Sequence, residues 1–437
     1  MTGTMQTASR PKPLHWIALA LLVISVCINY ADRGNLGVAA KSIEAELHFS
    51  PGDLGMLLGT FFLSYAAFQL VAGKLIDRWN VNWVYAAGFL LWSAATGVTG
   101  LVSTFTALLL LRLLLGAGEA VAYPAYSKII AAVFPEQLRG TANALIDAGS
   151  KVGPALGVFL GVTLVARFSW RGMFVIIALA SFIWLLPWCF IAPRLAVKRL
   201  AKASVWAPTY WELIQKRALW GTVLGLFGAN YGWYFLLNWL PYYLENDRHM
   251  RGDRLALLGS LPFAALATSS LFFGLFADFL IRRGREPGRV RQIIISLGLL
   301  GCCALLLPAV LVRSDTLFNL FLLLACVSMG GFSSNHWALT QRLAGVEAAG
   351  KWTGFENCIG NIAGFAAGYV SGIAVRQTHS FVAAFAIVSA SLLAGAFGFS
   401  YGIGTPSPVL WRPHETKSDP LAYTRGLPTK SEDNVIY

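Results

Sequence analysis

Long apolar segments without charge dominate the pattern of this sequence. Nine segments contain no Asp, Glu, Lys or Arg. They are residues 54–73, 79–111, 172–193, 218–244, 255–277, 292–312, 316–341, 357–375 and 380–411. An α-helix needs ~20 apolar residues to cross the hydrocarbon core of a bilayer, so the pattern predicts a series of transmembrane helices.

Three further segments, 14–40, 104–127 and 140–167, are apolar but carry a few charges. Residues 100–106 interrupt the segment 79–111, which therefore holds one span and the start of the next. Only helices and closed barrels satisfy the backbone in lipid, and these segments are too long and too uniformly apolar for barrel strands. We therefore predict an all-α membrane protein with twelve transmembrane helices in two six-helix bundles.

A basic segment after the sixth predicted span divides the chain into two halves. The expected organisation is a cytoplasmic N-terminus at 1–13, an N-terminal bundle at 14–192, a basic cytoplasmic linker at 193–217 and a C-terminal bundle at 218–404. The tail at 405–437 is rich in Pro, Ser and charged residues, and we expect it to be cytoplasmic and disordered.

Composition and charge agree with this prediction. Hydrophobic residues make up 56% of the chain and charged residues only 13%, whereas soluble domains carry about 25% charged residues. The net charge of +13 could suggest a nucleic-acid partner, but with both termini in the cytoplasm 23 of the 34 basic residues fall on cytoplasmic ends and loops. That asymmetry follows the positive-inside rule. No nucleic acid is expected, and the six scattered cysteines predict neither disulfides nor a metal site.

Seven ionisable residues remain inside the predicted spans, and six of them lie in the first half. They are Asp32, Arg33, Arg112, Glu119, Asp147, Lys151 and Glu356. Each costs ~2.5–3.5 kcal/mol to insert at a helix centre, so they are candidates for function. Arg112 and Glu119 lie two turns apart on one helix face, and we expect them to border one cavity with Asp32 and Arg33. The alternative is a purely structural network of ion pairs.

The chemistry of these groups suggests distinct roles. A low-dielectric environment raises the pKa of a carboxyl group, and a nearby guanidinium lowers it. A carboxyl group subject to both effects can bind and release a proton as its surroundings change. Asp32 and Glu119 are therefore the predicted proton carriers, with Arg112 as their internal partner. Arg33 has a planar donor fork suited to a substrate carboxylate. Asp147 and Lys151, four residues apart, predict either an ion pair within one helix or added positive charge in the cavity.

Two short patterns suggest a duplicated architecture. A Gly-x-x-x-Asp pattern follows the second predicted span at Gly73 and Asp77, and recurs 201 residues later at Gly274 and Asp278. Such repeats are typical of transporters built from two parallel halves. The first copy continues into Arg78 and resembles the loop motif of the major facilitator superfamily, although Trp-Asn-Val replaces the residues that usually follow it.

Within that superfamily, the segment Asn-Tyr-Ala-Asp-Arg-Gly-Asn-Leu at 29–36 resembles the first-span motif of the anion:cation symporters. The segment Arg-Leu-Leu-Leu-Gly-Ala-Gly-Glu-Ala at 112–120 resembles the fourth span of the same family. The resemblance covers about residues 14–404. It implies an importer, not an enzyme, that carries a small organic anion such as a hexonate or hexuronate with protons by alternating access.

The resemblance also implies partners, location and binding residues. The proton is the coupling ion and no cofactor is expected. The protein is expected to act as a monomer among the lipids of a bacterial inner membrane, with both termini in the cytoplasm. Residues at positions that resemble the family's substrate contacts are Tyr30, Tyr65, Ser334, His336, Trp337 and Asn357, with Asp32 and Glu119 as proton carriers. Ser150 occupies an often polar position, Asn361 either joins the site or bonds a neighbouring helix, and Glu356 has no assigned role.

Other functions remain open at this stage. Gly149, Gly153, Pro154 and Gly157 resemble a motif of drug:proton antiporters, although cationic drugs favour an acidic cavity. A phosphate-ester antiporter would need a base in the seventh span, and 218–244 has none. A membrane enzyme would need a recognisable catalytic motif, which is missing, and a sensor would be expected to carry a signalling domain.

Gly360, Gly364 and Gly368 form a small-residue stripe that predicts close helix packing.

Overall fold

The computed structural model describes residues 11–134, 136–195 and 208–411, and these residues form helices joined by short connections, with no strand among them. The first half contains α1 (Pro13–Leu47), α2 (Pro51–Arg78), α3 (Val81–Thr99), α4 (Phe105–Glu119), α5 (Ala122–Val133), α6 (Glu136–Ile191) and the short turn η1 (Ala192–Arg194). The second half contains α7 (Tyr210–Ile214), α8 (Arg217–Asn246), α9 (Gly252–Arg282), α10 (Pro287–Leu311), α11 (Asp315–Thr378), α12 (Phe381–Phe397) and η2 (Gly398–Gly402).

Two of these helices each contain two membrane spans. Ser169 in α6 and Gly345 in α11 have positive φ values of 62° and 68°, so the chain breaks its helix at each point. By length and composition, eight helical stretches in the described part could cross a membrane, and one of them, Ala142–Arg194, includes the break at Ser169. The helices α2, α3 and α8 have 28, 19 and 30 residues. Together these make the twelve predicted transmembrane helices, with α4 and α5 counted as one.

Local sequence explains where several helices begin. Ser50 caps α2 in a capping box with Asp53, and Pro51 occupies the first turn. Glu286 caps α10 by accepting from the backbone amides of Gly288 (3.0 Å) and Arg289 (2.6 Å). Such caps satisfy amide groups that have no partner within the first turn.

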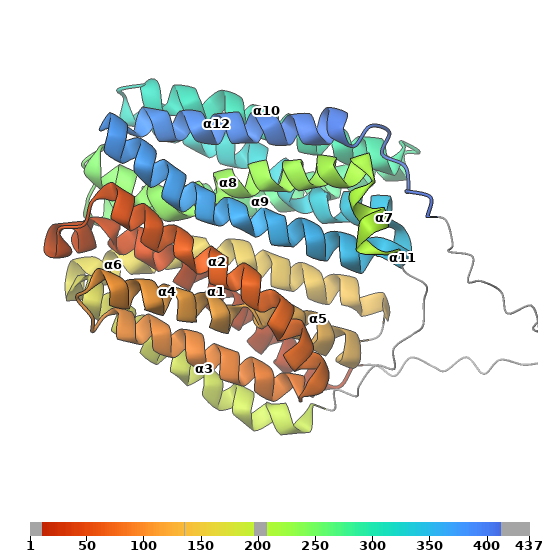
Figure 1. Ribbon diagram of the computed structural model, residues 1–437, viewed down its shortest axis with the longest axis horizontal. Coiled ribbons are helices and arrows are strands. Elements are labelled where there is room, and N and C mark those ends of the chain that lie inside the picture. The colour runs from red at the N-terminus through yellow and green to blue at the C-terminus, as the bar shows by residue number, and fades with distance from the viewer. Residues whose placement is uncertain (1–10, 135, 196–207, 412–437) are drawn as a thin grey trace, which may run out of the picture.

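The helices lie side by side in two groups, α1–α6 and α7–α12 (Figure 1). Equivalent close contacts occur in both groups. A Cβ atom added to Gly116 of α4 would lie only 2.1 Å from Ser64 Oγ of α2. A Cβ atom added to Gly330 of α11 would likewise lie 2.1 Å from Ser269 Oγ of α9. Each glycine thus allows the second and fourth spans of its group to approach closely. This repeated packing agrees with the predicted duplication.

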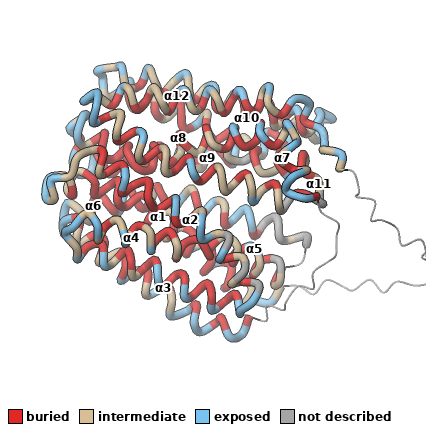
Figure 2. The backbone as a smooth tube through the Cα atoms, viewed as in Figure 1, coloured by how far each residue is buried: buried red, intermediate tan, exposed pale blue. Residues whose placement is uncertain are grey.

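Buried residues lie throughout the interiors of the two groups and where the groups meet (Figure 2). Large apolar side chains remain exposed on outward faces, among them Leu186 (71% exposed) and Leu297 (63%). A water-soluble protein would not leave so many such groups exposed on helices of this length. The chain is an integral membrane protein.

Several close contacts join the two groups at the end where α1 finishes and α2 starts, which we call the closed end. A Cβ on Gly37 of α1 would lie 2.4 Å from the Asn238 carbonyl oxygen of α8. The predicted glycine stripe also contributes, since a Cβ on Gly368 would lie 2.6 Å from the backbone nitrogen of Gly59 and one on Gly364 would lie 2.4 Å from the Phe62 ring. The stripe therefore packs α11 against α2, as predicted.

Two polar contacts reinforce the closed end. Lys41 Nζ donates to the Glu245 carbonyl oxygen (3.0 Å), and the Tyr242 hydroxyl donates to Glu44 Oε2 (2.7 Å). Both contacts cross from α1 to α8. The two groups are thus tied by side chains that could be separated without breaking either group internally.

Candidate functional site

Four of the predicted charged residues meet inside the first group of helices. Asp32 and Arg33 come from α1, Arg112 and Glu119 come from α4, and all four are buried. Glycines explain how α4 reaches this position, because Gly116 lies against α2 and Gly118 lies against α3. We call Asp32, Arg33, Arg112 and Glu119 the charged cluster.

The central contact of the charged cluster joins Arg33 and Glu119. Arg33 Nε donates to Glu119 Oε2 at 2.8 Å, with the two side chains 2% and 0% exposed. From the sequence, Arg112 was the expected partner of the acids. Instead, Arg112 Nε donates to the Leu57 carbonyl oxygen of α2 (3.2 Å), and its charge acts on Asp32 and Glu119 without a direct bond.

Each member of the charged cluster also keeps one buried polar atom without a hydrogen-bond partner among the described residues. These atoms are Asp32 Oδ2, Arg33 Nη2, Arg112 Nη2 and Glu119 Oε1. Asp32 uses its other oxygen to accept from Asn35 Nδ2 (3.0 Å). Buried polar groups normally find a partner, so this arrangement has spare capacity for protons, water or a polar ligand.

Aromatic rings surround the Arg33 guanidinium. Its Cζ lies 4.6 Å from the ring centres of Tyr30 and Tyr65 and 5.2 Å from that of Phe61. These distances allow cation–π attraction. The Tyr30 hydroxyl lies 3.1 Å from the Tyr123 hydroxyl. The structure thus brings the predicted residues Tyr30 and Tyr65 together with Arg33.

The second group reaches toward this site through α8 and α11. The Tyr234 hydroxyl donates to Asn361 Oδ1 (3.3 Å), and Asn361 Nδ2 donates to the Asn357 carbonyl oxygen (2.8 Å). The Tyr234 ring also lies 4.2 Å from the Phe62 ring of α2. Asn361 therefore bonds a neighbouring helix, which was one of its two predicted roles.

His336 and Glu356 lie together in the second group. His336 Nε2 is 3.3 Å from Glu356 Oε1, and the Trp337 ring is 4.5 Å from the imidazole. His336, Glu356 and Trp337 all belong to α11. Ser334 belongs to the same helix, and its side chain lies outside the described part of the structure. Sequence reasoning left Glu356 without a role and did not pair it with His336.

Asp147 and Lys151 form the predicted ion pair within α6. Ser150 Oγ donates to the Asp147 carbonyl oxygen at 2.6 Å. The Asp147 side chain is 46% exposed and that of Lys151 is 14% exposed. The charge of Lys151 is therefore largely balanced within its own helix.

Sequence reasoning missed Phe61, Tyr123 and Tyr234. Each is an aromatic residue in an apolar span rich in aromatic residues, so its side chain looked like ordinary packing. Tyr123 had one indication, because it follows the fourth-span motif directly. Phe61 and Tyr234 had none, since only the packing of α2 and α8 brings them to the site.

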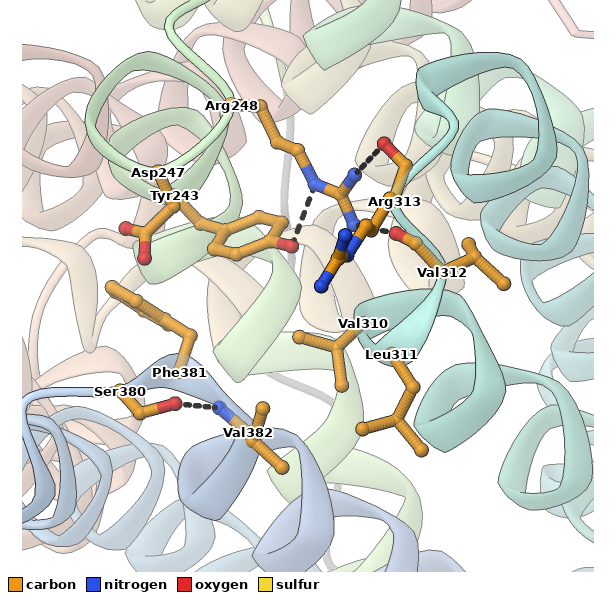
Figure 3. A pocket seen from close by; sticks show the side chains of 10 residues that line it. All are labelled: Tyr243, Asp247, Arg248, Val310, Leu311, Val312, Arg313, Ser380, Phe381 and Val382. Carbon is orange, nitrogen blue, oxygen red and sulfur yellow. Dashed lines mark hydrogen bonds between the residues drawn. The ribbon is translucent and has the colours of Figure 1, made fainter.

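A shallow pocket at the closed end is a separate feature (Figure 3). Arg248 lies in it, and its Nε donates to the Tyr243 hydroxyl (2.9 Å). The same guanidinium donates to the carbonyl oxygens of Val312 (2.8 Å) and Arg313 (3.3 Å). These donors hold the end of α8 to the end of α10, so we interpret Arg248 as structural.

Comparison of the sequence with known proteins identifies its family. The sequence model of the Major Facilitator Superfamily matches residues 22–368. A probable L-galactonate transporter of Escherichia coli is 29% identical, with 92% of each chain covered. A probable galactarate/D-glucarate transporter of the same species is 27% identical, with 90% of this chain and 96% of that protein covered. A hexuronate transporter of Bacillus subtilis is 26% identical, with 93% and 98% covered.

A solved structure agrees at the level of the fold. The inward-facing, unoccupied form of a bacterial homologue of the human lysosomal transporter Spinster superimposes with a TM-score of 0.73 and 18% identity. The match covers 90% of this chain and 96% of that one. With the family match over most of the sequence, the predicted relationship is confirmed, and the chain belongs to the Major Facilitator Superfamily.

Proposed function

We propose that this protein imports a sugar acid, a hexonate or a hexuronate, together with protons. Support comes from relatives that are named as transporters of galactonate, galactarate, glucarate and hexuronate. Since its family and these relatives are transporters, the protein is not an enzyme. We further propose a monomer in a bacterial inner membrane, with both termini cytoplasmic, lipid around it, the proton as coupling ion and no cofactor.

The observation that carries the proposal is the buried ion pair between Arg33 and Glu119. Arg33 is the predicted ligand of the substrate carboxylate, yet its Nε is bonded to Glu119. A substrate carboxylate and the Glu119 carboxylate therefore compete for one guanidinium. When Glu119 takes up a proton, its attraction to Arg33 falls and Arg33 can bind the anion.

Asp32 extends this coupling to a second proton. It lies beside Arg33 on α1 and, among the described residues, accepts a hydrogen bond from Asn35 alone, so its other oxygen can take a proton when water reaches the site. An anion that enters with more than one proton carries net positive charge inward. The membrane potential then contributes ~2.3 kcal/mol per charge at 100 mV.

Residues of both helix groups are proposed to contact the remaining parts of the substrate. Tyr30 and Tyr65 would contact the carboxylate and its neighbouring hydroxyl, while Trp337, Asn357, His336 and Ser334 would face the hydroxylated chain. A site shared in this way lets the two groups rock around the bound anion, which is alternating access.

The decisive experiment is uptake of labelled sugar acids into proteoliposomes, with and without an imposed pH gradient. We expect the wild-type protein to accumulate a hexonate or hexuronate only with the gradient. Asp32→Asn and Glu119→Gln should still exchange substrate across the membrane but accumulate less of it under the gradient, because neither amide can carry a proton. Full accumulation by both variants would contradict the proton role, and uptake of an organic cation in place of the acids would favour the drug:proton antiporter.

A further inference from the structure

A second pair of buried ionisable groups lies in the C-terminal group of helices. His336 comes from α11 before the break at Gly345, and Glu356 comes from the same helix after it. His336 Nε2 and Glu356 Oε1 are 3.3 Å apart, and the two side chains are 2% and 0% exposed. The charged cluster described above contains neither residue.

The surroundings of this pair are neutral. The Phe332 ring stacks on His336 with centres 4.9 Å apart, and Phe399 of η2 packs against it edge-on at 5.7 Å. The hydroxyl groups of Thr222 on α8 and Thr340 on α11 lie close to the Glu356 carboxylate. Within the described ranges, no other charged or titratable group acts on either side chain.

Hydrogen bonding leaves the pair unsatisfied. Both nitrogens of His336 and both carboxylate oxygens of Glu356 are buried and lack a hydrogen bond of regular geometry to any part of the chain that the structure describes. A lone carboxylate in such a place costs several kcal/mol. One proton makes the pair neutral overall, whether it sits on the imidazole or on the carboxyl group.

We propose that His336 and Glu356 form a second proton-binding site, in the C-terminal group, and that one proton travels through it with each imported anion. This inference rests on the proposed function. At 3.3 Å the two groups are close enough to share one proton. The proton enters from water on the side where the anion binds and returns to water on the side where the anion leaves, so only an N–H or O–H bond forms and breaks.

The position of the pair links it to the substrate. His336 is itself a predicted substrate contact, and so are Trp337, which follows it in the chain, and Asn357, which follows Glu356. The Trp337 ring lies 4.5 Å from the His336 ring, so movement of the indole against a bound sugar acid would change the packing over the imidazole. Substrate binding and water access to the pair are thereby coupled.

The test compares proton numbers in proteoliposomes whose membrane potential is set with potassium and valinomycin. The voltage at which net flux of labelled sugar acid stops gives the protons moved per anion. We expect Glu356→Gln and His336→Gln each to move one proton fewer than the wild type. Ser389→Ala removes another buried polar group of the same half, one without a hydrogen-bond partner among the described residues, and should leave the number unchanged.

The outcomes separate this inference from the proposed function. If the wild type moves protons with the anion and Glu356→Gln moves the same number, the second site is wrong while the proposed function stands. If the wild type moves no protons, both are wrong. Should Glu356→Gln fail to fold, the double variant Asp32→Asn, Glu119→Gln, which keeps the pair intact, decides the matter. Purified in weak buffer with a pH indicator, it should still exchange about one proton with the medium per anion bound, and no proton exchange would overturn the inference.

Discussion

Arg33 is held by an acid of its own protein, and the same guanidinium is the group proposed to bind the substrate. Its Nε is bonded to Glu119, while its Nη2 has no partner in the described part of the chain. A guanidinium in this position can hold one carboxylate strongly at a time, since a second would add an uncompensated buried charge. Competition for Arg33 is therefore the residue-scale basis of the proposed coupling.

Arg33→Ala should weaken binding of the transported sugar acid by about 10- to 100-fold, because a hydrogen bond to a charged group contributes ~1.5–3 kcal/mol. The measurement is calorimetric titration of the purified protein in detergent. Arg254→Ala is the matched control, since Arg254 is 57% exposed and paired with Asp315 away from the cluster. Unchanged affinity in Arg33→Ala would rule out its role as the anion ligand.

At the scale of helices, close approach depends on residues without side chains. The stripe on α11 lets it lie against α2, because a side chain at Gly364 would overlap the Phe62 ring. Not every glycine on this helix has such a role, since a Cβ at Gly354 would meet nothing within 4 Å. Replacing Gly364 or Gly354 by alanine therefore distinguishes the effect of a tighter helix contact on stability from the effect of helix propensity.

Gly364→Ala should lower the Tm of the purified protein, because the new methyl group would lie 2.4 Å from Phe62 Cδ1 and overpacking costs about 1–3 kcal/mol. Gly354→Ala should leave the Tm unchanged or raise it, since alanine favours a helix. Thermal unfolding in detergent gives both values. Equal Tm values for the two variants would mean that α2 and α11 do not pack as described.

Glu286 shows how one residue outside the spans fixes the start of a helix. It caps α10 and also accepts from Arg342 Nη2 of α11 at 2.8 Å. Partial burial raises the pKa of its carboxyl group, but the amides of Gly288 and Arg289 and the charge of Arg342 outweigh this, so the net pKa is lowered. A lowered pKa in the folded protein stabilises it above the pKa of the unfolded chain, and this contribution disappears as pH falls through the folded value.

Glu286→Ala should therefore destabilise the protein at pH 7 by about 0.5–2 kcal/mol, the usual effect of losing a helix cap. The difference in Tm between the variant and the wild type should shrink as the pH falls through the lowered pKa of this carboxyl group, where it becomes protonated. Thermal unfolding at a series of pH values measures it. A difference that stays constant to pH 3 would show that the charge of Glu286 contributes nothing.

For the whole molecule, transport requires the two groups of helices to separate at the closed end. The contacts there are the approach of Gly37 to Asn238, the packing of the glycine stripe of α11 against α2, and the polar contacts of Lys41 and Glu44 with α8. The packing inside each group is more extensive and is expected to persist. Rigid rocking of one group against the other follows from that difference.

A covalent link across the closed end should therefore stop transport. In a variant without its six native cysteines, Glu44→Cys and Tyr242→Cys would place thiols where the Tyr242 hydroxyl now bonds Glu44. A short bifunctional maleimide should abolish sugar-acid uptake, while a monofunctional maleimide of similar size should leave most of it. Continued uptake by the fully linked protein would contradict rocking at this end.

The sequence by itself determined the membrane class, the number of spans, the family and which charges lie within the spans. It could do so because apolar length and the high cost of a charge in lipid are properties of each segment alone. It also predicted the ion pair of Asp147 and Lys151, because residues four apart on a helix are neighbours in any fold.

Only the tertiary structure decided which charges bond to each other. The sequence assigned Arg112 to the acids, but the rotation and spacing of α1, α2 and α4 place Arg33 on Glu119 and turn Arg112 toward Leu57. The pairing of His336 with Glu356 likewise depends on how α11 folds back at Gly345. Contacts between distant segments depend on helix rotation and on close approach at glycines, and no single segment encodes either.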